Sequence, residues 1–553
     1  MKIKSKRVVF RCIGYFFSKI RYLRIKDPFK KFVLLKQKSA FSAKTIFDPI
    51  KKRPNILVLP IRVSPTSNLL EGLLGYALSL RGCNVSCLLD GGYLDISENN
   101  SIEGKNFIST ALSVYEQNRF ARAFEQRPIY FDSLIQPQEI ELIKVQLMNL
   151  SLVELSSFRF KDISVGLHAK YGLMRYLKRE TICEVHRDLM YDFVITAIKC
   201  VIATESAINN VKPDHALISH GCYSTWGTCL EVLNKHKVPA VVWGRGYVAG
   251  GSVIFSHDDS YLYEYIHEPN EYWNESSLTD AQIKRVLDYY KKKRIPQNSV
   301  DGISYYKSKP DERKLSALKE RVASYDACIG IYPNIPWDGT MFSGTTNFPT
   351  IRHFLEKLHS YVIKNPKIIF ITRCHPAEIN NKGNETQESF LEIFDQVFTR
   401  KPKNIIVIPP QDSVSSYDVS ALCNAAVMFG STLSLELSIA RHPVIQVGQT
   451  NTTNKGFIFD APTEALFFQY LDQAARGSLE LTDYQVNLAI KYAYHWIFKR
   501  HIPETLVELD GMKYKNFKFN NIKELLPNNN SVLDFICDAI ISRKSFILPE
   551  NFS

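Results

Sequence analysis

Between residues 371 and 448 the chain passes twice from an apolar, strand-like run into a helix, and this alternation restricts the choice of fold. The apolar runs cover residues 367–370 and 425–429, and a third strand-like run covers residues 443–448. Strands that alternate with helices are typical of parallel sheets, because parallel strands need long crossover connections. The sequence therefore predicts an α/β fold with a parallel sheet.

Polar residues follow each of the first two runs. After the first run stand Arg373, His375 and Glu378, and after the second stand Gly430, Ser431, Thr432 and Glu436. In an open parallel sheet, ligands bind outside the carboxyl ends of the strands. We therefore expect both groups to face one cleft.

The residue types in these groups suit a phosphorylated sugar. Arg373 offers paired donors to a phosphate. Ser431 or Thr432 can cap a helix whose amide groups attract an anion, and Gly430 lets a ligand approach the backbone. Glu436 lies one helical turn after Thr432 and is expected to bind sugar or ribose hydroxyls. The alternative interpretation of these residues is an ordinary capped helix and a proline loop.

Short motifs spread over residues 185–460 provide a family resemblance. They are residues 220–223 (HGCY), 243–246 (WGRG), 255–261 (FSHDDSY), 332–338 (YPNIPWD), 373–378 (RCHPAE), 430–432 (GST) with Glu436, and 442–444 (HPV). Together they resemble the bacterial capsule polysaccharide biosynthesis proteins, which are similar to glycosyltransferases of the GT-B fold. Cys374 and the pair Arg441 and His442 depart from the usual pattern, which leaves the identity of the donor open.

The resemblance implies two Rossmann-like domains that face a cleft, with a nucleotide-sugar held mainly by the second. It implies transfer of a sugar to a hydroxyl of a capsule or other surface-polysaccharide acceptor, either polysaccharide or lipid-linked. Fixed cations and helix amides would stabilise the departing phosphate, with Lys455 as a further cation. We therefore expect neither a metal ion nor a cofactor besides the nucleotide-sugar substrate. The donor-binding residues would be Arg373, His375, Glu378, Gly430, Ser431, Thr432, Glu436 and Lys455.

The first domain offers three candidates for the base that takes the acceptor proton. His220 stands at the end of a strand, and His257 and Asp258 stand in the segment 255–265. Each also has a structural interpretation. His220 can be a helix-entry residue bonded to the backbone, and Asp258 with Asp259 can form an Asx-type turn.

The length of 553 residues exceeds what one hydrophobic core supports, so several domains are expected. We expect a basic leader at 1–53, an N-terminal Rossmann-like acceptor domain at 54–270 with an insertion at about 95–185, a connection at 271–324, a C-terminal Rossmann-like donor domain at 325–480, and C-terminal helices at 481–553. The loop at 62–68 lacks the G-x-G-x-x-G spacing, so a dinucleotide is not indicated.

The excess of positive charge is confined to the leader. Residues 1–53 hold 17 Lys or Arg and two Asp, a net charge of +15, whereas the remaining 52 basic and 54 acidic residues give −2. Basic stretches interleaved with aromatic residues bind anionic membrane surfaces. Nucleic acid is a competing partner, but no nucleic-acid module is recognisable, so we expect none. A solvated, disordered tail is the remaining alternative.

The location in the cell follows from apolar runs and cysteines. No run reaches the roughly 18 apolar residues of a membrane span, and no small-residue cleavage site follows the first apolar stretch. The eleven cysteines form no close metal-type pair apart from Cys83 and Cys87, and their odd number suits a reducing compartment. We expect a cytoplasmic protein that lies peripherally on the inner face of the cell membrane.

The leading hypothesis is a metal-independent GT-B glycosyltransferase. A CDP-polyol phosphotransferase of GT-B type is a second enzyme hypothesis, which a phosphodiester in the product would identify. A non-catalytic polysaccharide-assembly subunit at the membrane is the third. Failure to bind any nucleotide would favour the third hypothesis.

Overall fold

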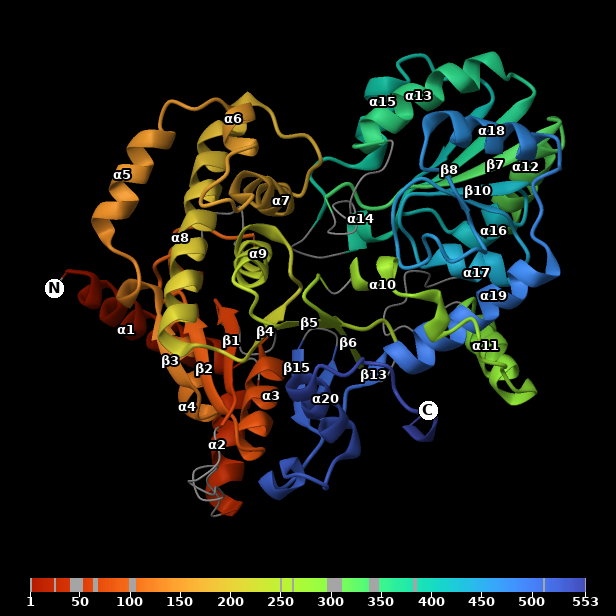
Figure 1. The fold of residues 1–553 in the computed structure, drawn as a ribbon. Coiled ribbons are helices and arrows are strands. Elements are labelled where there is room, and N and C mark those ends of the chain that lie inside the picture. The colour runs from red at the N-terminus through yellow and green to blue at the C-terminus, as the bar shows by residue number, and fades with distance from the viewer. Residues whose placement is uncertain are drawn as a thin grey trace. The chain divides into compact units, whose positions relative to one another are not determined.

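The computed structural model describes residues 2–23, 26–39, 53–62, 68–98, 106–248, 251–260, 263–295, 311–337, 348–380, 385–510 and 513–552. Contacts divide the chain into two compact units. Unit 1 holds Met1–Tyr176, Cys183–Tyr261 and Arg500–Ser553, and unit 2 holds Leu177–Ile182 and Leu262–Lys499. Each unit contains a mainly parallel sheet with helices packed on it, so the prediction of an α/β fold with parallel sheets is confirmed (Figure 1). That the two domains face a cleft stays a prediction.

The sheet of unit 1 has seven strands in the order β13-β6-β5-β4-β1-β2-β3. The strands are β1 (Asn55–Ile61), β2 (Asn84–Leu89), β3 (Arg127–Tyr130), β4 (His215–Ser219), β5 (Ala240–Arg245), β6 (Ser252–His257) and β13 (Ile502–Pro503). Strands β1 to β5 are parallel, and β6 runs antiparallel to β5. The strand order reverses between β1 and β4, and such a reversal leaves a crevice outside the carboxyl ends of the two strands.

The helices of unit 1 connect these strands and cover the sheet. They are α3 (Leu69–Leu80), α4 (Asn106–Ala123), α5 (Pro137–Leu147), α6 (Leu152–Ser156), α7 (Val165–Leu177), α8 (Arg187–Val211) and α9 (Thr228–Lys235), with the short helices η2 (Phe131–Ser133), η3 (Glu184–His186) and η4 (Tyr223–Gly227). The expected insertion at 95–185 thus contributes strand β3 to the sheet of unit 1 and helix α4 to the helices packed on it. Its residues 177–182 belong to unit 2.

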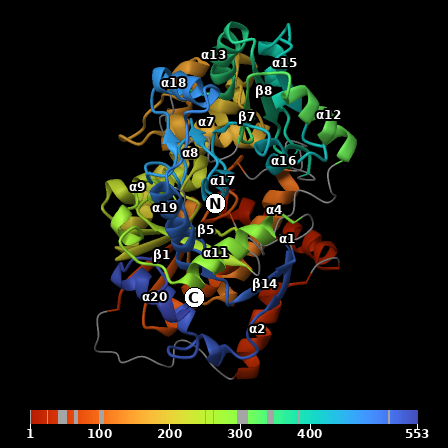
Figure 2. The same ribbon diagram turned by 90° about the vertical axis from the view of Figure 1, so that its right-hand side faces the viewer.

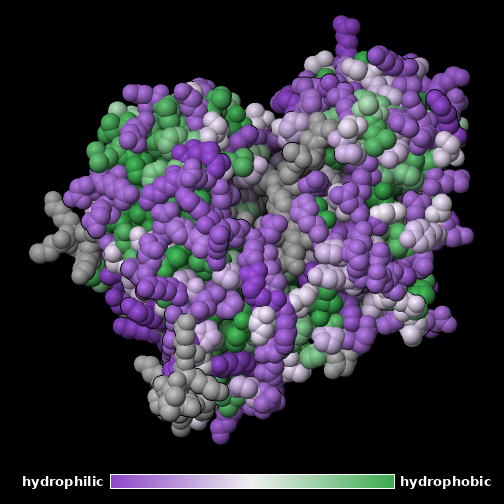
Figure 3. Space-filling model, viewed as in Figure 1, coloured by the Kyte–Doolittle hydropathy of each residue, from purple (hydrophilic) through white to green (hydrophobic). Residues whose placement is uncertain are grey.

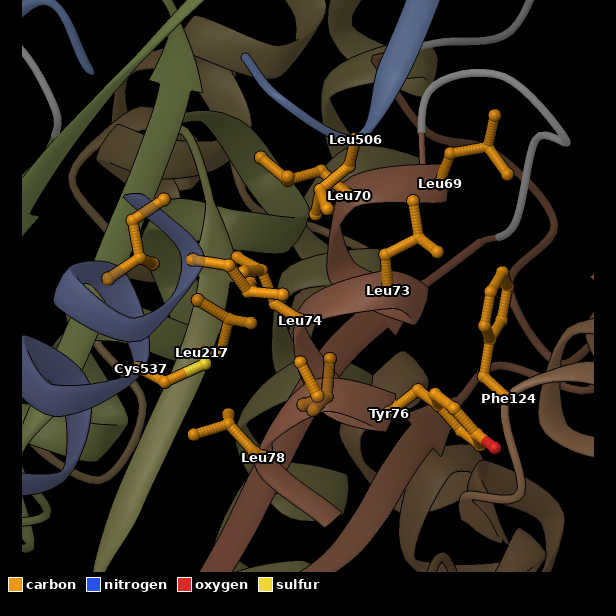
Figure 4. Close-up of a cluster of buried hydrophobic side chains, with 14 of the residues drawn as sticks. Leu69, Leu70, Leu73, Leu74, Tyr76, Leu78, Phe124, Leu217, Leu506 and Cys537 are labelled. Atoms are coloured by element: carbon orange, nitrogen blue, oxygen red, sulfur yellow. The ribbon is translucent and has the colours of Figure 1, made fainter. Parts of the chain in front are cut away.

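Both ends of the chain contribute to the core of unit 1. Helices α1 (Lys2–Tyr22) and α2 (Pro28–Ser39) come from the start, and the β14 (Val507–Asp510) and β15 (Lys513–Phe517) hairpin, η8 (Ile522–Leu525), α20 (Ser531–Ser542) and η9 (Glu550–Phe552) come from the end. Figure 4 shows Cys537 of α20 and Leu506 beside the leucines of α3.

The leader is packed against unit 1 through α2. Phe32 is fully buried, and its ring centroid lies 4.7 Å from that of Phe124 and 5.2 Å from that of Tyr76. It also contacts Phe517, which places α2 next to the β14–β15 hairpin (Figure 2). The alternative of a disordered tail is therefore wrong for residues 2–23 and 26–39, while residues 40–52 lie outside the described part of the chain.

The sheet of unit 2 has six parallel strands in the order β12-β11-β10-β7-β8-β9. They are β7 (Ala327–Tyr332), β8 (Ile368–Arg373), β9 (Ile405–Ile408), β10 (Ala425–Met428), β11 (Val444–Gln446) and β12 (Phe459–Asp460). The order reverses between β7 and β10, so unit 2 has a crevice position of the same type as unit 1.

The helices of unit 2 include the segment that was expected to connect two domains. They are α10 (Tyr263–His267), η5 (Asn270–Tyr272), α11 (Asp280–Lys293), α12 (Glu312–Val322), α13 (Ile351–Lys364), α14 (Ala377–Asn380), α15 (Phe390–Val397), α16 (Ser416–Ser420), α17 (Leu433–Ile439), α18 (Glu464–Ala475), α19 (Asp483–Tyr494) and η7 (His495–Arg500). Gln282 of α11 bonds to Tyr494 of α19 at 3.1 Å. The segment 271–324 therefore belongs to unit 2, and the expected C-terminal helices are divided at Arg500 between the two units.

No helix in the described part of the chain combines the length and the apolar character that crossing a bilayer requires.

Candidate functional site

The strand-order reversal of unit 1 is followed by a strained loop. His220, Gly221 and Tyr223 come directly after β4 and have φ angles of 54°, 71° and 71°. Positive φ is uncommon for residues other than glycine, and residues held in such conformations cluster at functional sites. The loop leads into η4, a π-helix, and short π-helices are frequent at functional sites. The end of β4 is therefore the strongest candidate site in unit 1.

His220 is held in this loop by its neighbours. Its ring is stacked on Trp226, with centroids 5.0 Å apart and 17° between the planes, and its Nδ1 is paired with the hydroxyl of Ser219. Burial, and then the positive charges of Arg175 and Arg245, lower the pKa of His220 to about 3. The imidazole is therefore neutral at physiological pH, which is the form that can accept a proton.

The η4 helix is fixed by polar contacts beneath the loop. The buried carboxylate of Glu98 accepts hydrogen bonds from the hydroxyls of Ser224 and Thr225. Arg175 donates to the Tyr223 hydroxyl at 3.2 Å and lies over its ring. The loop therefore presents a neutral imidazole and a guanidinium on a rigid support, which suits a ligand that carries hydroxyl or anionic groups.

Glu71 is a residue at this site that the sequence analysis missed. It lies in the first turn of α3, directly after the β1 crossover, and is fully buried. It accepts hydrogen bonds from Asn68 and from Trp243 Nε1, the latter at 3.3 Å, and burial raises its pKa to about 7. The Trp243 carbonyl accepts the His220 amide at 2.9 Å. The sequence offered one signal for this residue, because Asn68 followed three positions later by Glu71 is typical of a helix start.

The structure does not bring His257 and Asp258 to His220. Because β6 runs antiparallel to β5, His257 pairs with Val241 near the amino end of β5. His220, in contrast, follows the carboxyl end of the neighbouring strand β4. Asp258 accepts the Ala240 amide at 2.8 Å and forms an ion pair with Arg543. Of the three alternative candidate bases, His220 is the one that lies at the end of β4, and Asp258 has the turn role that was its structural alternative.

The strand-order reversal of unit 2 is followed by Gly430, Ser431 and Thr432. Ser431 Oγ accepts the Leu433 amide at 3.2 Å, whereas the Thr432 side chain is exposed and makes no cap bond to α17. His375 follows β8, which is separated from β10 by one strand, so these strand ends lie about 10 Å apart. That spacing is comparable with the size of a nucleotide.

Arg373 does not have the role expected of it. Its side chain is 2% exposed, and its guanidinium donates to five backbone carbonyls at 2.6 to 3.5 Å. The carbonyls belong to Cys374, Pro409, Pro410, Asp412 and Val414. Arg373 therefore holds the loop after β9 in place, and the predicted phosphate contact is corrected to a structural one.

Two further donor-site candidates are also engaged within unit 2. Lys455 is 2% exposed and donates to the Glu268 carbonyl at 2.9 Å. Glu436 is 2% exposed, forms an ion pair with Lys293 at 2.7 Å and accepts from the Tyr417 hydroxyl at 2.6 Å. Neither side chain is placed to meet a ligand directly in this conformation.

His375 and Glu378 form the remaining polar group at the end of β8. His375 Nδ1 accepts the Ala377 amide at 3.1 Å, which places the ring proton on Nε2 of the neutral form. Glu378 accepts the Phe390 amide at 3.2 Å, while its Oε1 is buried without a hydrogen-bond partner among the described residues. Burial raises the pKa of Glu378 to about 7. Across the described ranges, no three His, Cys, Asp or Glu side chains are grouped to hold a metal ion.

Comparisons with known proteins give similarities of fold only. No family model and no curated protein matches the chain. One similar solved structure is Thermosulfurimonas dismutans KpsC, a beta Kdo 2,4 transferase, with 15% identity and a TM-score of 0.35 over 57% of this chain and 87% of the other. A UDP-GlcNAc 2-epimerase from Neisseria meningitidis has 11% identity and a TM-score of 0.24 over 79% and 98%. A glycosyltransferase from Rickettsia africae has 10% identity and a TM-score of 0.26 over 89% and 100%.

Proposed function

We propose that the protein transfers a glycosyl group from a nucleotide-sugar to a hydroxyl of a surface-polysaccharide or lipid-linked acceptor. The observation that carries this proposal is the strained His220 loop at the strand-order reversal of unit 1. Unit 2 repeats the same topology, with Gly430 and Ser431 at its reversal. Two such sheets provide one crevice position for an acceptor and one for a donor.

The chemistry assigns one task to each unit. The acceptor oxygen attacks the anomeric carbon, the bond from that carbon to the phosphate oxygen breaks, and the phosphate leaves with the bonding electrons. We assign His220 to the acceptor proton, because its neutral imidazole stands at the strand-order reversal; since its pKa is about 3 in the unliganded protein, the role requires that the bound anionic donor raise this pKa. We assign the donor phosphate to the exposed turn at Gly430, Ser431 and Thr432, with His375 as a further hydrogen-bond donor.

Whether the reaction uses a metal ion is a separate question. Arg373 and Lys455, two of the cations expected to neutralise the leaving phosphate, are bound to backbone carbonyls. Turnover measured with and without a chelator tests metal independence directly.

The test of the proposal is a donor screen with the full chain. UDP-, GDP-, CDP- and CMP-linked sugars are tested first for thermal stabilisation and then for release of the nucleotide. His220→Asn should lower turnover by about 100-fold or more while leaving nucleotide binding unchanged, because a positioned base contributes roughly that factor. His236→Asn changes an exposed histidine at the end of α9 in the same unit and is the matched control. Undiminished turnover in His220→Asn, or failure of the protein to bind any nucleotide, would refute the proposal.

A further inference from the structure

Helix α1 is attached to unit 1 by one face. Phe10 is buried in a cluster with Ala111 and Val114 of α4. Gly14 lies so close to α4 that a Cβ atom would sit 2.0 Å from the Ala111 carbonyl oxygen, and Ser18 is 2% exposed. Since these positions are four residues apart, they form one continuous docked face.

The opposite face of α1 is also apolar, although it is exposed. We call it the outer face, and it consists of Val8, Val9, Cys12, Tyr15, Phe16, Ile20 and Leu23. Phe16 is 62% exposed and Leu23 is 85% exposed. Among residues 7–23, Lys19 is the one exposed side chain that is charged. A contiguous apolar surface of this kind marks a site of interaction.

The net charge of the N-terminal stretch that contains α1 indicates what kind of surface covers the outer face. Residues 1–53 carry 17 Lys or Arg against two Asp, and one of these, Asp27, is neutralised by an ion pair with Arg119. Lys30 and Lys38 of α2 are exposed. A second copy of the chain would bring two basic leaders together, which charge repulsion opposes. An anionic surface is complementary to this charge.

We propose that the outer face of α1 binds an anionic lipid bilayer, with the helix lying in the plane of the interface. The part of α1 from Val8 to Tyr22 spans about 22 Å, so the apolar side chains of the outer face can enter the boundary between headgroups and acyl chains over this length. Lys19 reaches the lipid phosphates by extending its side chain. The sequence predicted a basic amphipathic leader; the structure docks one apolar face of α1 on α4 and leaves the other exposed. This proposal does not depend on glycosyl transfer, because lipid binding is measured without turnover.

Flotation with vesicles tests the proposal. The full chain should float with vesicles of phosphatidylglycerol and phosphatidylcholine, and much less with phosphatidylcholine alone. Phe16→Ser with Ile20→Ser should weaken binding about tenfold or more, because two large apolar side chains no longer enter the lipid. Since both side chains are exposed, thermal unfolding should be unchanged.

The matched control is a second set of exposed apolar residues in unit 1. Figure 3 shows apolar residues gathered over α5 and α6, among which Leu142 and Val145 are 69% and 66% exposed. Leu142→Ser with Val145→Ser should leave flotation unchanged. Equal losses in the two double variants would overturn the assignment to α1. Equal binding to both vesicle types would overturn the role of charge.

A polarity-sensitive dye on Cys12 locates the contact. Cys12 and Cys183 are the exposed cysteines, so each can be labelled after the other is changed to serine. A dye on Cys12 should shift to the blue on anionic vesicles and be quenched by a lipid-borne quencher, and a dye on Cys183 should not. A concentration-dependent dimer that Phe16→Ser abolishes, without any vesicle binding, would show that a second copy covers the outer face and would refute the proposal.

Discussion

Replacing Arg373 with methionine tests whether this arginine supports unit 2 or binds a substrate. The guanidinium makes five hydrogen bonds to the carbonyls of the β8 end and of the loop after β9, and the side chain is 2% exposed. Methionine preserves most of the side-chain volume and removes every donor. The change therefore separates loss of these bonds from creation of a large cavity.

The magnitude follows from the bonds that are lost. A buried carbonyl left without a donor costs about 1 to 3 kcal/mol. Because the loop can relax and water can reach part of the five carbonyls, the total is about 3 to 5 kcal/mol and not the sum of five such costs. We expect Arg373→Met to lower the free energy of unfolding of unit 2 by about 3 to 5 kcal/mol. For a unit of this size, that corresponds to a fall in Tm of roughly 6 to 20 °C.

Scanning calorimetry is the assay, because it can follow separate transitions of two units. Arg441→Met is the matched control, since Arg441 is 54% exposed and its ion pair with Asp483 lies at the surface, so a change below about 0.5 kcal/mol is expected. An Arg373→Met protein that is as stable as the wild type but no longer binds nucleotide would refute the structural role and restore the phosphate contact.

Two further predictions concern unit 1. Phe32→Ala should destabilise it by about 3 to 5 kcal/mol in chemical unfolding, because the ring is fully buried against Phe124 and Tyr76; a loss below about 1 kcal/mol would show that α2 is not docked. Burial raises the pKa of Glu71 from 4.5 to about 7, so the native state holds the proton more tightly than the unfolded state and stability should fall as the pH rises through this range. Glu71→Gln should remove up to about 3 kcal/mol of this pH-dependent loss in the free energy of unfolding, measured from unfolding curves at several pH values. Identical pH dependence in the two proteins would contradict the raised pKa of Glu71.

Elements with strong local signals were predictable from the sequence. The strand-like runs at 367–370, 425–429 and 443–448 correspond to β8, β10 and β11, because each is a short apolar stretch that ends at polar residues or glycine. The parallel α/β class also followed from the sequence, since apolar strands alternate with helices, but the order of the strands in each sheet did not.

The roles of the site residues depended on partners far away in the sequence. Four of the five carbonyls bound by Arg373 come from a loop 36 to 41 residues later, and nothing near Arg373 in the sequence indicates them. His257 and Asp258 were misplaced because the antiparallel direction of β6 is set by pairing with β5 and not by local pattern. The α1 pattern was visible, but which of its two apolar faces meets α4 was decided by close packing at Gly14.

The return of the segment 500–553 to unit 1 has a consequence for how the protein forms during synthesis. The β13 strand pairs with β6, and Leu533 and Cys537 of α20 belong to the same core as Phe29 of α2. While the ribosome is still translating unit 2, the nascent first half lacks these side chains and exposes the apolar surface that they later cover. All residues of unit 2 have been translated at Lys499, whereas unit 1 still lacks residues 500–553 at that point. We therefore expect unit 2 to complete its folding before unit 1. The newly made protein should need chaperones until translation passes Cys537.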